Sequence, residues 1–217
     1  MTSPTSRPTF SGRSGDPFAG IPGRRIFVAA PLPDETRIAV SEIVSRVRSA
    51  APPGDREVRW VRLDALHVTL RFLGPTPEPG VLEAEAAVRA TAAAVRSIRV
   101  SLAGSGTFPP MGRPRALWLG IADGDGALAD LAAALNRRLE AHGWPANDRP
   151  FNAHLTLARS DGIVAGPRTA ALLATAVGDL VLPLTLDRIV LYESVTGGGA
   201  ARYVPLAEAT LGSGEPG

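Results

Sequence analysis

The chain has 217 residues, 45% of them hydrophobic, and a formal net charge of only +2. It contains no cysteine, and all 23 of its basic residues are arginine. These absences exclude disulfides, zinc–thiolate sites and thiol nucleophiles, and also any enzyme that works through a lysyl-nucleotide intermediate or a lysine Schiff base.

The length favours one compact unit with two lobes. Residues 1–23 are dense in Ser, Pro, Gly and Arg, so we expect a disordered N-terminal tail, a single domain over residues 24–208 and a flexible tail over residues 209–217. No apolar run approaches the ~18 residues that a membrane helix needs, and the N-terminus lacks the apolar middle of a secretory signal. We therefore expect a cytoplasmic monomer that does not bind membranes.

Hydrophobic spacing predicts the elements of the first half. Val40, Ile43, Val44 and Val47 fall on one face of a helix. In chain order the pattern predicts a strand over 25–33, a helix from about residue 34, strands over 56–63 and 65–74, a helix over 81–96 and a strand over 97–108.

The second half repeats this order. It predicts a strand over 115–123, a helix containing Leu128, Leu131, Leu135 and Leu139, a strand from residue 154, a helix over 167–180 and a strand over 181–194. Arg115 follows Arg25 by 90 residues, and His154 follows His67 by 87. Near-constant offsets indicate an internal repeat, here two β-α-β-α-β units in tandem.

Each unit carries the same short motif, HVTL at residue 67 and HLTL at residue 154. Residues i and i+2 of a strand point to one face, so His67 projects with Thr69 and His154 with Thr156. A single histidine in a strand is usually structural, whereas two such matches arise by chance on the order of once in several thousand sequences of this composition. If the repeats pair about a pseudo-twofold axis, the two His-Thr pairs face each other across a cleft.

Two facing histidines suit acid–base chemistry better than metal binding. No third ligand, no HExxH motif and no Asp/Glu cluster accompanies them, so we expect neither a metal nor another cofactor. With an unperturbed pKa near ~6.5, one imidazole can be neutral and the other protonated near neutral pH. Threonine hydroxyls and arginine suit phosphate oxygens. His142, at a predicted helix end before Gly143, is interpreted as structural.

These motifs resemble the 2H phosphoesterases, and most closely the bacterial and archaeal RNA 2′,3′-cyclic phosphodiesterases, also known as 2′-5′ RNA ligases. The resemblance runs over about residues 24–207, through RIFVAAPLP, LHVTLRFLG, GTFPPMGRPRALWLG, RPFNAHLTLAR, IVLYES and GARYVPL. One departure is NAHLTL, where relatives often place a histidine and a proline before the second motif. The resemblance implies an α+β, two-lobed fold with pseudo-twofold symmetry, in which antiparallel sheets line a central cleft and the helices lie outside.

The resemblance also implies a hydrolase, an RNA 2′,3′-cyclic 3′-phosphodiesterase that opens an RNA or nucleotide 2′,3′-cyclic phosphate to a 2′-phosphomonoester without a metal. His154 would be the general base, His67 the general acid, and Thr69 and Thr156 would hold phosphate oxygens. Arg159 would add positive charge, although strict alternation places it on the opposite face unless the strand bulges near Ala158.

Several points stay open at the level of sequence. Val68, Leu70 and Phe72 are expected to pack behind the first motif, yet the ring that stacks the terminal base is undecided, and its candidates are Trp60, Phe72, Trp118 and Tyr192. A 2′-5′ RNA ligase would use the same two histidines in the reverse reaction. A non-catalytic RNA- or nucleotide-binding module is a further alternative, although binding alone does not need an acid–base pair.

Overall fold

The computed structural model describes residues 22–52, 57–122, 126–147, 150–195 and 201–212. The first unit comprises β1 (Arg24–Pro31), α1 (Asp34–Ala50), β2 (Val58–Trp60), a 3₁₀ turn η1 (Leu63–Ala65), β3 (His67–Thr76), α2 (Glu78–Ala93) and β4 (Ile98–Phe108). The second comprises β5 (Ala116–Ala122), α3 (Ala127–Ala141), β6 (His154–Ser160), α4 (Ala165–Val177), β7 (Val181–Leu186), β8 (Arg188–Val195) and β9 (Arg202–Thr210).

These strands pair antiparallel into one open sheet with the order β7-β4-β5-β6-β3-β1-β8-β9, and β2 pairs with β6. The sheet has two halves that join where β3 meets β6, through the pair Val68 and Leu155. Outward from this junction, one half continues as β3, β1 and β8, and the other as β6, β5 and β4. In each half the first two strands come from one unit, and the third comes from the other unit. The expected α+β fold with pseudo-symmetric antiparallel halves is confirmed.

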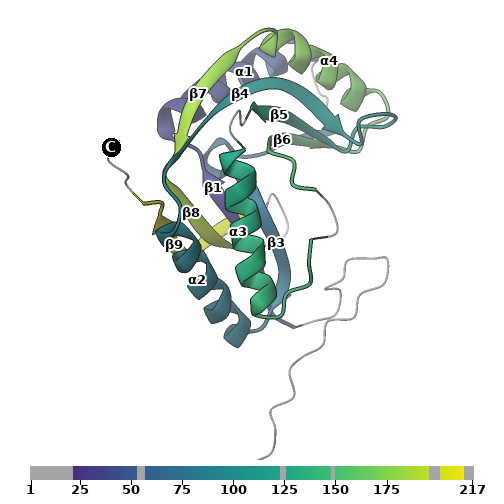
Figure 1. Cartoon of the computed structure of the whole chain (residues 1–217). Coiled ribbons are helices and arrows are strands. Elements are labelled where there is room, and N and C mark those ends of the chain that lie inside the picture. The colour runs from purple at the N-terminus through teal and green to yellow at the C-terminus, as the bar shows by residue number, and fades with distance from the viewer. Residues whose placement is uncertain (1–21, 53–56, 123–125, 148–149, 196–200, 213–217) are drawn as a thin grey trace, which may run out of the picture.

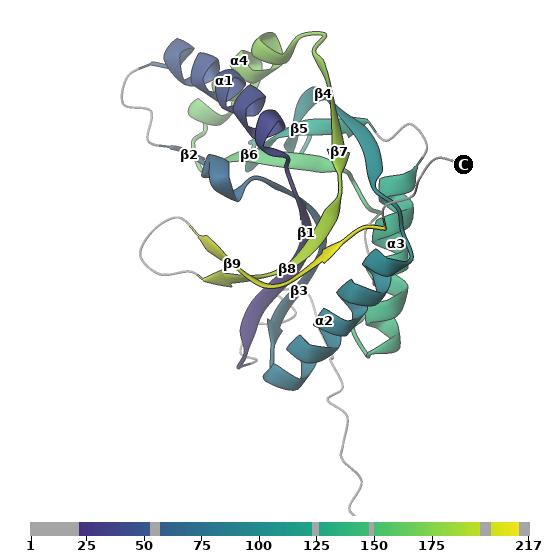
Figure 2. The same cartoon turned by 90° about the vertical axis from the view of Figure 1, so that its left-hand side faces the viewer.

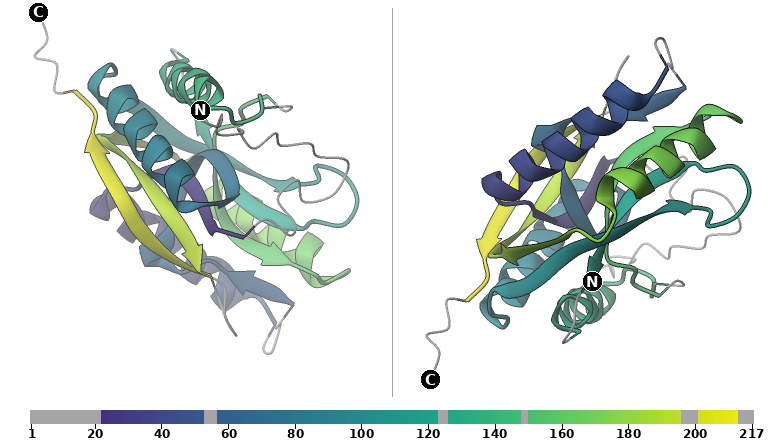
Figure 3. Two further views of the ribbon diagram at one scale, coloured as in Figure 1. Left: turned by 90° about the horizontal axis from the view of Figure 1, so that it is seen from below. Right: turned by 90° about the horizontal axis from the view of Figure 1, so that it is seen from above.

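The helices are exchanged between the units as well. Figure 1 shows α1 beside α4 over one half of the sheet, and α2 beside α3 along the other half; both views in Figure 3 agree. We call these halves the α1/α4 lobe (β2, β4, β5, β6, β7) and the α2/α3 lobe (β1, β3, β8, β9); they lie above and below one another in Figure 2. All four helices cover outer surfaces, so the strands form the inside of the molecule.

One hydrophobic cluster joins both lobes. The face of α1 predicted from spacing is buried, and the four leucines of α3 are fully buried, which is the reason these segments form amphipathic helices packed on the sheet. Each fully buried leucine contributes roughly 1.5–3 kcal/mol relative to exposure. The His-bearing strands β3 and β6 run through the centre of this cluster, so their side chains stand on a rigid base.

The structure corrects two expectations about the last third of the chain. The strand predicted over 181–194 is two strands that separate at Asp187: β7 pairs with β4 in one lobe and β8 with β1 in the other. The chain was also expected to be flexible from residue 209, but β9 continues to Thr210 and the Leu211 side chain is only 2% exposed. The backbone N–H of Leu211 donates to the carbonyl of Asp187, which ties this end to the β7–β8 corner.

The expected N-terminal tail lies outside the described residues up to residue 21, as does the C-terminal segment 213–217. Within the described part of the chain, no helix is long and apolar enough to cross a membrane.

Candidate active site

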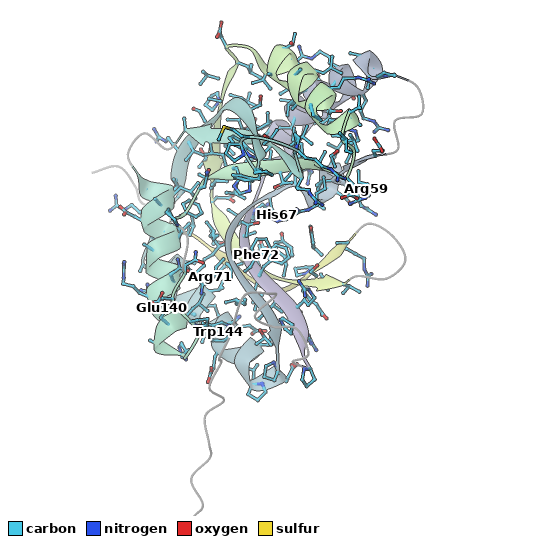
Figure 4. All side chains as sticks on the ribbon, turned by 90° about the vertical axis from the view of Figure 1, so that its right-hand side faces the viewer. Arg59, His67, Arg71, Phe72, Glu140 and Trp144 are labelled. Atoms are coloured by element: carbon cyan, nitrogen blue, oxygen red, sulfur yellow. The ribbon has the colours of Figure 1, made fainter. Side chains whose placement is uncertain are left out.

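The two His-x-Thr motifs meet at the centre of the sheet. Val68 and Leu155, which pair β3 with β6, are each flanked by a histidine and a threonine. Both flanking pairs point to the same face, because i and i+2 of a strand share a face. The structure thereby brings His67, Thr69, His154 and Thr156 together on the wall of one cavity of about 530 Å³. Figure 4 shows His67 in the middle of the molecule, between the lobes.

The two imidazoles are oriented in the same way. His67 Nδ1 lies 2.8 Å from the carbonyl oxygen of Ala65, and His154 Nδ1 lies 2.8 Å from that of Asn152. A carbonyl oxygen only accepts hydrogen bonds, so each Nδ1 carries the proton and donates it. Each ring therefore keeps Nε2 for proton exchange. The motif pattern does not indicate that the backbone carbonyl of Asn152 orients His154.

Aromatic rings surround both histidines, and they enclose His67 more fully. The His67 ring centre lies 5.0 Å from that of Phe27 and 5.1 Å from that of Tyr203, which meets it edge-on. Burial among these rings lowers the pKa of His67, because desolvation disfavours the charged form. The hydrogen bond to Ala65 opposes this effect, and a positive charge on His154 adds to it.

His154 has its own aromatic backing. The Phe108 ring lies edge-on to it at 4.9 Å, and the Trp118 ring lies 6.2 Å away. The indole of Trp118 packs against Phe108 and crosses Gly106, where a Cβ would lie 2.3 Å from the ring. Trp118 therefore packs beside His154 on the same face of the sheet and is not among the side chains that line the cavity.

A β-bulge brings Arg159 into the cavity. Leu117 pairs with Ala158 and Trp118 pairs with Thr156, so Leu157 is the extra residue on β6. The bulge buries both Leu157 and Ala158 and returns Arg159 to the face of His154 and Thr156. The sequence predicts that Arg159 reaches the site only if the strand bulges near Ala158, and the structure has this bulge. Among the described residues, no carboxylate forms an ion pair with Arg159.

The same bulge occurs in β3 and places Phe72 in the cavity. Val28 pairs with Arg71 and Ala29 with Thr69, which leaves Leu70 as the extra residue. The expectation that Phe72 packs behind the motif is wrong: its side chain is 64% exposed and lines the cavity, as Figure 4 indicates beside His67. Strict alternation fails at this residue because it does not allow for the bulge.

The other rings considered from sequence lie elsewhere. Trp60 packs against the hydrophobic cluster, and Tyr192 lines a smaller neighbouring cavity. Tyr203 lines both cavities, but it is not among the aromatic candidates from the sequence. It belongs to the GARYVPL motif, and this motif does not indicate that β9 returns beside His67. His142 follows α3 at its C-terminal end and lies outside the cavity.

Comparison with known proteins identifies the family of the chain. A family model described as the 2′-5′ RNA ligase superfamily matches residues 32–198. The chain belongs to this superfamily. The resemblance to 2H phosphoesterases seen in the motifs is thus confirmed, and both histidine motifs lie within the matched range.

Two curated relatives of this superfamily member carry the name RNA 2′,3′-cyclic phosphodiesterase. The one from Methanothermobacter thermautotrophicus is 32% identical over 72% of this chain and 79% of its own length. The one from Escherichia coli is 30% identical over 84% of this chain and 94% of its own length.

Solved structures agree with the fold. TT0787 of Thermus thermophilus matches with a TM-score of 0.72 and 29% identity, over 88% of this chain and 100% of that one. Escherichia coli LigT complexed with 3′-AMP matches with a TM-score of 0.66 and 25% identity, over 87% and 98%. Among the residues described in our structure, no group of three or more His, Asp or Glu is placed to hold a metal ion.

Proposed function

We propose that this chain hydrolyses RNA 2′,3′-cyclic phosphate ends to 2′-phosphomonoesters with His67 and His154 as the acid–base pair. The observation that carries the proposal is the pair of imidazoles on the wall of one cavity, each with Nδ1 held by a backbone carbonyl. Thr69, Thr156 and Arg159 line the same cavity. The names of the curated relatives support the reaction class.

The proposed reaction is an in-line displacement at phosphorus. Nε2 of His154 takes a proton from a water molecule while the water oxygen bonds to phosphorus. The bond from phosphorus to the 3′-oxygen breaks, and Nε2 of His67 gives its proton to the 3′-oxygen. The phosphate remains on the 2′-oxygen. A solvent proton exchange then returns each histidine to its starting state. Because one histidine accepts a proton while the other donates one, the proposal needs no metal for either transfer.

The low pKa of His67 is compatible with its role as the acid. Burial lowers the pKa of His67 in the free protein, and a negative charge beside the ring opposes this effect by favouring the protonated form. A phosphodiester bound between the histidines supplies that charge. Once protonated, a buried imidazolium is a stronger proton donor than an exposed one, which favours transfer to the departing oxygen.

The remaining cavity groups are assigned by their chemistry. The hydroxyls of Thr69 and Thr156 donate hydrogen bonds to the non-bridging oxygens, and Arg159 stabilises the charge that grows on them in the transition state. Phe72 offers an exposed ring on the opposite side of the cavity and stacks on the terminal base. The two His-Thr pairs are arranged symmetrically. The side of the cavity with Phe72 differs from the side with Arg159, and this difference sets the orientation of the substrate.

The test is incubation of the purified chain with adenosine 2′,3′-cyclic phosphate, with the product identified by ³¹P NMR. We expect adenosine 2′-phosphate in the unchanged protein and in His142→Ala, whose histidine lies outside the cavity. Tight binding of the cyclic nucleotide without ring opening would support a binding module instead. Joining to a 5′-hydroxyl RNA that outpaces hydrolysis would support the 2′-5′ RNA ligase reaction.

A further inference from the structure

A second cavity of about 260 Å³ adjoins the main one. Both cavities are lined by the same four residues, Ala65, His67, Ala201 and Tyr203, which form the wall between them. The other side chains of the second cavity come from the end of β1, from α1, from the segment around η1 and from the β8–β9 pair. It therefore lies on the His67 side of the site and not on the His154 side.

Positive charge dominates the lining of this second cavity. Arg37, Arg62 and Arg202 line it together with a single carboxylate, that of Asp64. Arg62 binds Asp64 through two contacts, Nε to Oδ1 at 3.0 Å and Nη2 to Oδ2 at 2.6 Å, so these two charges balance each other. Two guanidinium groups remain beyond that pair.

The two remaining arginines differ in their surroundings. Arg37 binds Asp34 at 2.6 Å on the surface of α1, and this carboxylate is not part of the cavity lining. Arg202 is exposed at the start of β9 and forms no ion pair with any residue in the described ranges. Arg202 is thus the group best placed to accept a new anionic partner.

The aromatic part of the lining indicates what lies beside that anion. Tyr192 and Tyr203 line the cavity, and Tyr203 stands edge-on to His67 at 5.1 Å between the two cavities. A guanidinium fork matches the geometry of a phosphate. A tyrosine combines an apolar ring with a hydroxyl that can form a hydrogen bond with a sugar hydroxyl. A cavity with arginines on one side and tyrosines next to the catalytic histidine fits a sugar phosphate better than a nucleobase alone.

We infer that this second cavity binds the phosphate on the 5′ side of the terminal nucleotide, so that an end bearing this phosphate is a better substrate than a nucleoside 2′,3′-cyclic phosphate that lacks it. The inference rests on the proposed function. There, the 3′-oxygen of the terminal ribose lies against His67, which belongs to both cavities. With the base on Phe72 in the main cavity, the 5′ side of the same ribose continues past Tyr203 towards Arg202.

The experiment compares adenosine 2′,3′-cyclic phosphate with the same nucleotide carrying a 5′-phosphate, so the two substrates differ in a single group. We expect the 5′-phosphate to raise kcat/KM about tenfold in the unchanged protein. Arg202→Gln should reduce this ratio to about one. Arg89→Gln, an equal change of charge on α2 away from both cavities, should leave the ratio as it is.

The outcomes separate the inference from the function on which it rests. If the unchanged protein opens both substrates equally well, or if Arg202→Gln retains the tenfold ratio, the inference is wrong while the proposed function stands. If neither substrate is opened, the proposed function is wrong and the inference falls with it.

Salt supplies a second readout. Added salt screens the attraction between an exposed guanidinium group and a phosphate. The ratio between the two substrates should therefore decline with added salt in the unchanged protein and stay level in Arg202→Gln. A ratio that does not respond to salt in the unchanged protein would contradict a direct arginine–phosphate contact.

Discussion

Phe72 and Arg159 occupy equivalent positions, each two residues beyond the extra residue of a β-bulge in its own His-x-Thr strand. Both side chains are exposed and line the same cavity, one on the β3 side and the other on the β6 side. A repeated backbone feature thus presents an aromatic ring on one side and a guanidinium group on the other. Because this residue differs between the two copies, the site binds its substrate in one orientation although its catalytic groups are symmetric.

The first prediction concerns Phe72. Phe72→Ala should raise KM for adenosine 2′,3′-cyclic phosphate about tenfold, because stacking of a base on an aromatic ring contributes ~1–3 kcal/mol. Phe72→Trp should restore the KM. Leu82→Ala removes a comparably exposed apolar side chain outside both cavities and should change nothing. An unchanged KM in Phe72→Ala would exclude stacking on this ring.

The second prediction concerns Arg159. Arg159→Gln should lower kcat about 100-fold with a smaller change in KM, since its charge is needed most where negative charge develops. Arg159→Lys should recover part of the loss, because it restores the charge but not the guanidinium geometry. Steady-state kinetics give both constants. A change confined to KM would assign Arg159 to ground-state binding alone.

The third prediction concerns the two hydroxyls. Thr69→Val and Thr156→Val keep the side-chain shape and remove the donor, so each should lower kcat/KM by about 10- to 100-fold, the effect of one hydrogen bond to a charged group. Thr175→Val on α4 loses a hydroxyl that bonds to the carbonyl of Ala171 and should retain full activity. Full activity in both cavity variants would remove the threonines from the mechanism.

The fourth prediction concerns stability and pH. Folding lowers the pKa of His67, so the unfolded chain binds that proton more readily than the folded one. The stability that depends on a neutral His67 is present above about pH 6.5, its unfolded pKa, and is lost as the pH falls through the folded pKa. Each unit of lowered pKa corresponds to about 1.4 kcal/mol.

Urea unfolding of the protein and of His67→Asn between pH 8 and pH 5 measures this dependence. The free energy of unfolding of the unchanged protein should fall relative to the variant as the solution becomes acidic. A difference between the two that stays constant with pH would show that folding does not perturb His67.

Sequence was sufficient where local patterns carry the information. The spacing of valines in α1 and leucines in α3 predicts the buried helix faces, and the repeated His-x-Thr motif predicts that two pairs share one cavity. These features depend on which residues share a face, and periodicity reports this directly.

The sequence does not predict the features that depend on how distant strands pair in the sheet. Periodicity does not indicate that the third strand of each unit joins the other lobe, or that the chain separates into β7 and β8 at Asp187. It also assumes strict alternation, so it placed Phe72 on the wrong face and left Arg159 undecided. Both side chains reach the cavity because a bulge adds one residue opposite a neighbouring strand.

The most direct test of the central claim is a double-mutant cycle on the two histidines. Each proton transfer requires the other in the same step, so His67→Ala and His154→Ala should each lower kcat at least 1,000-fold, on the scale of other catalytic residues that act as a unit. The double variant should then be little worse than either single one, with all three proteins folded by circular dichroism. Losses that multiply in the double variant, or one histidine whose removal leaves kcat intact, would contradict a paired acid and base.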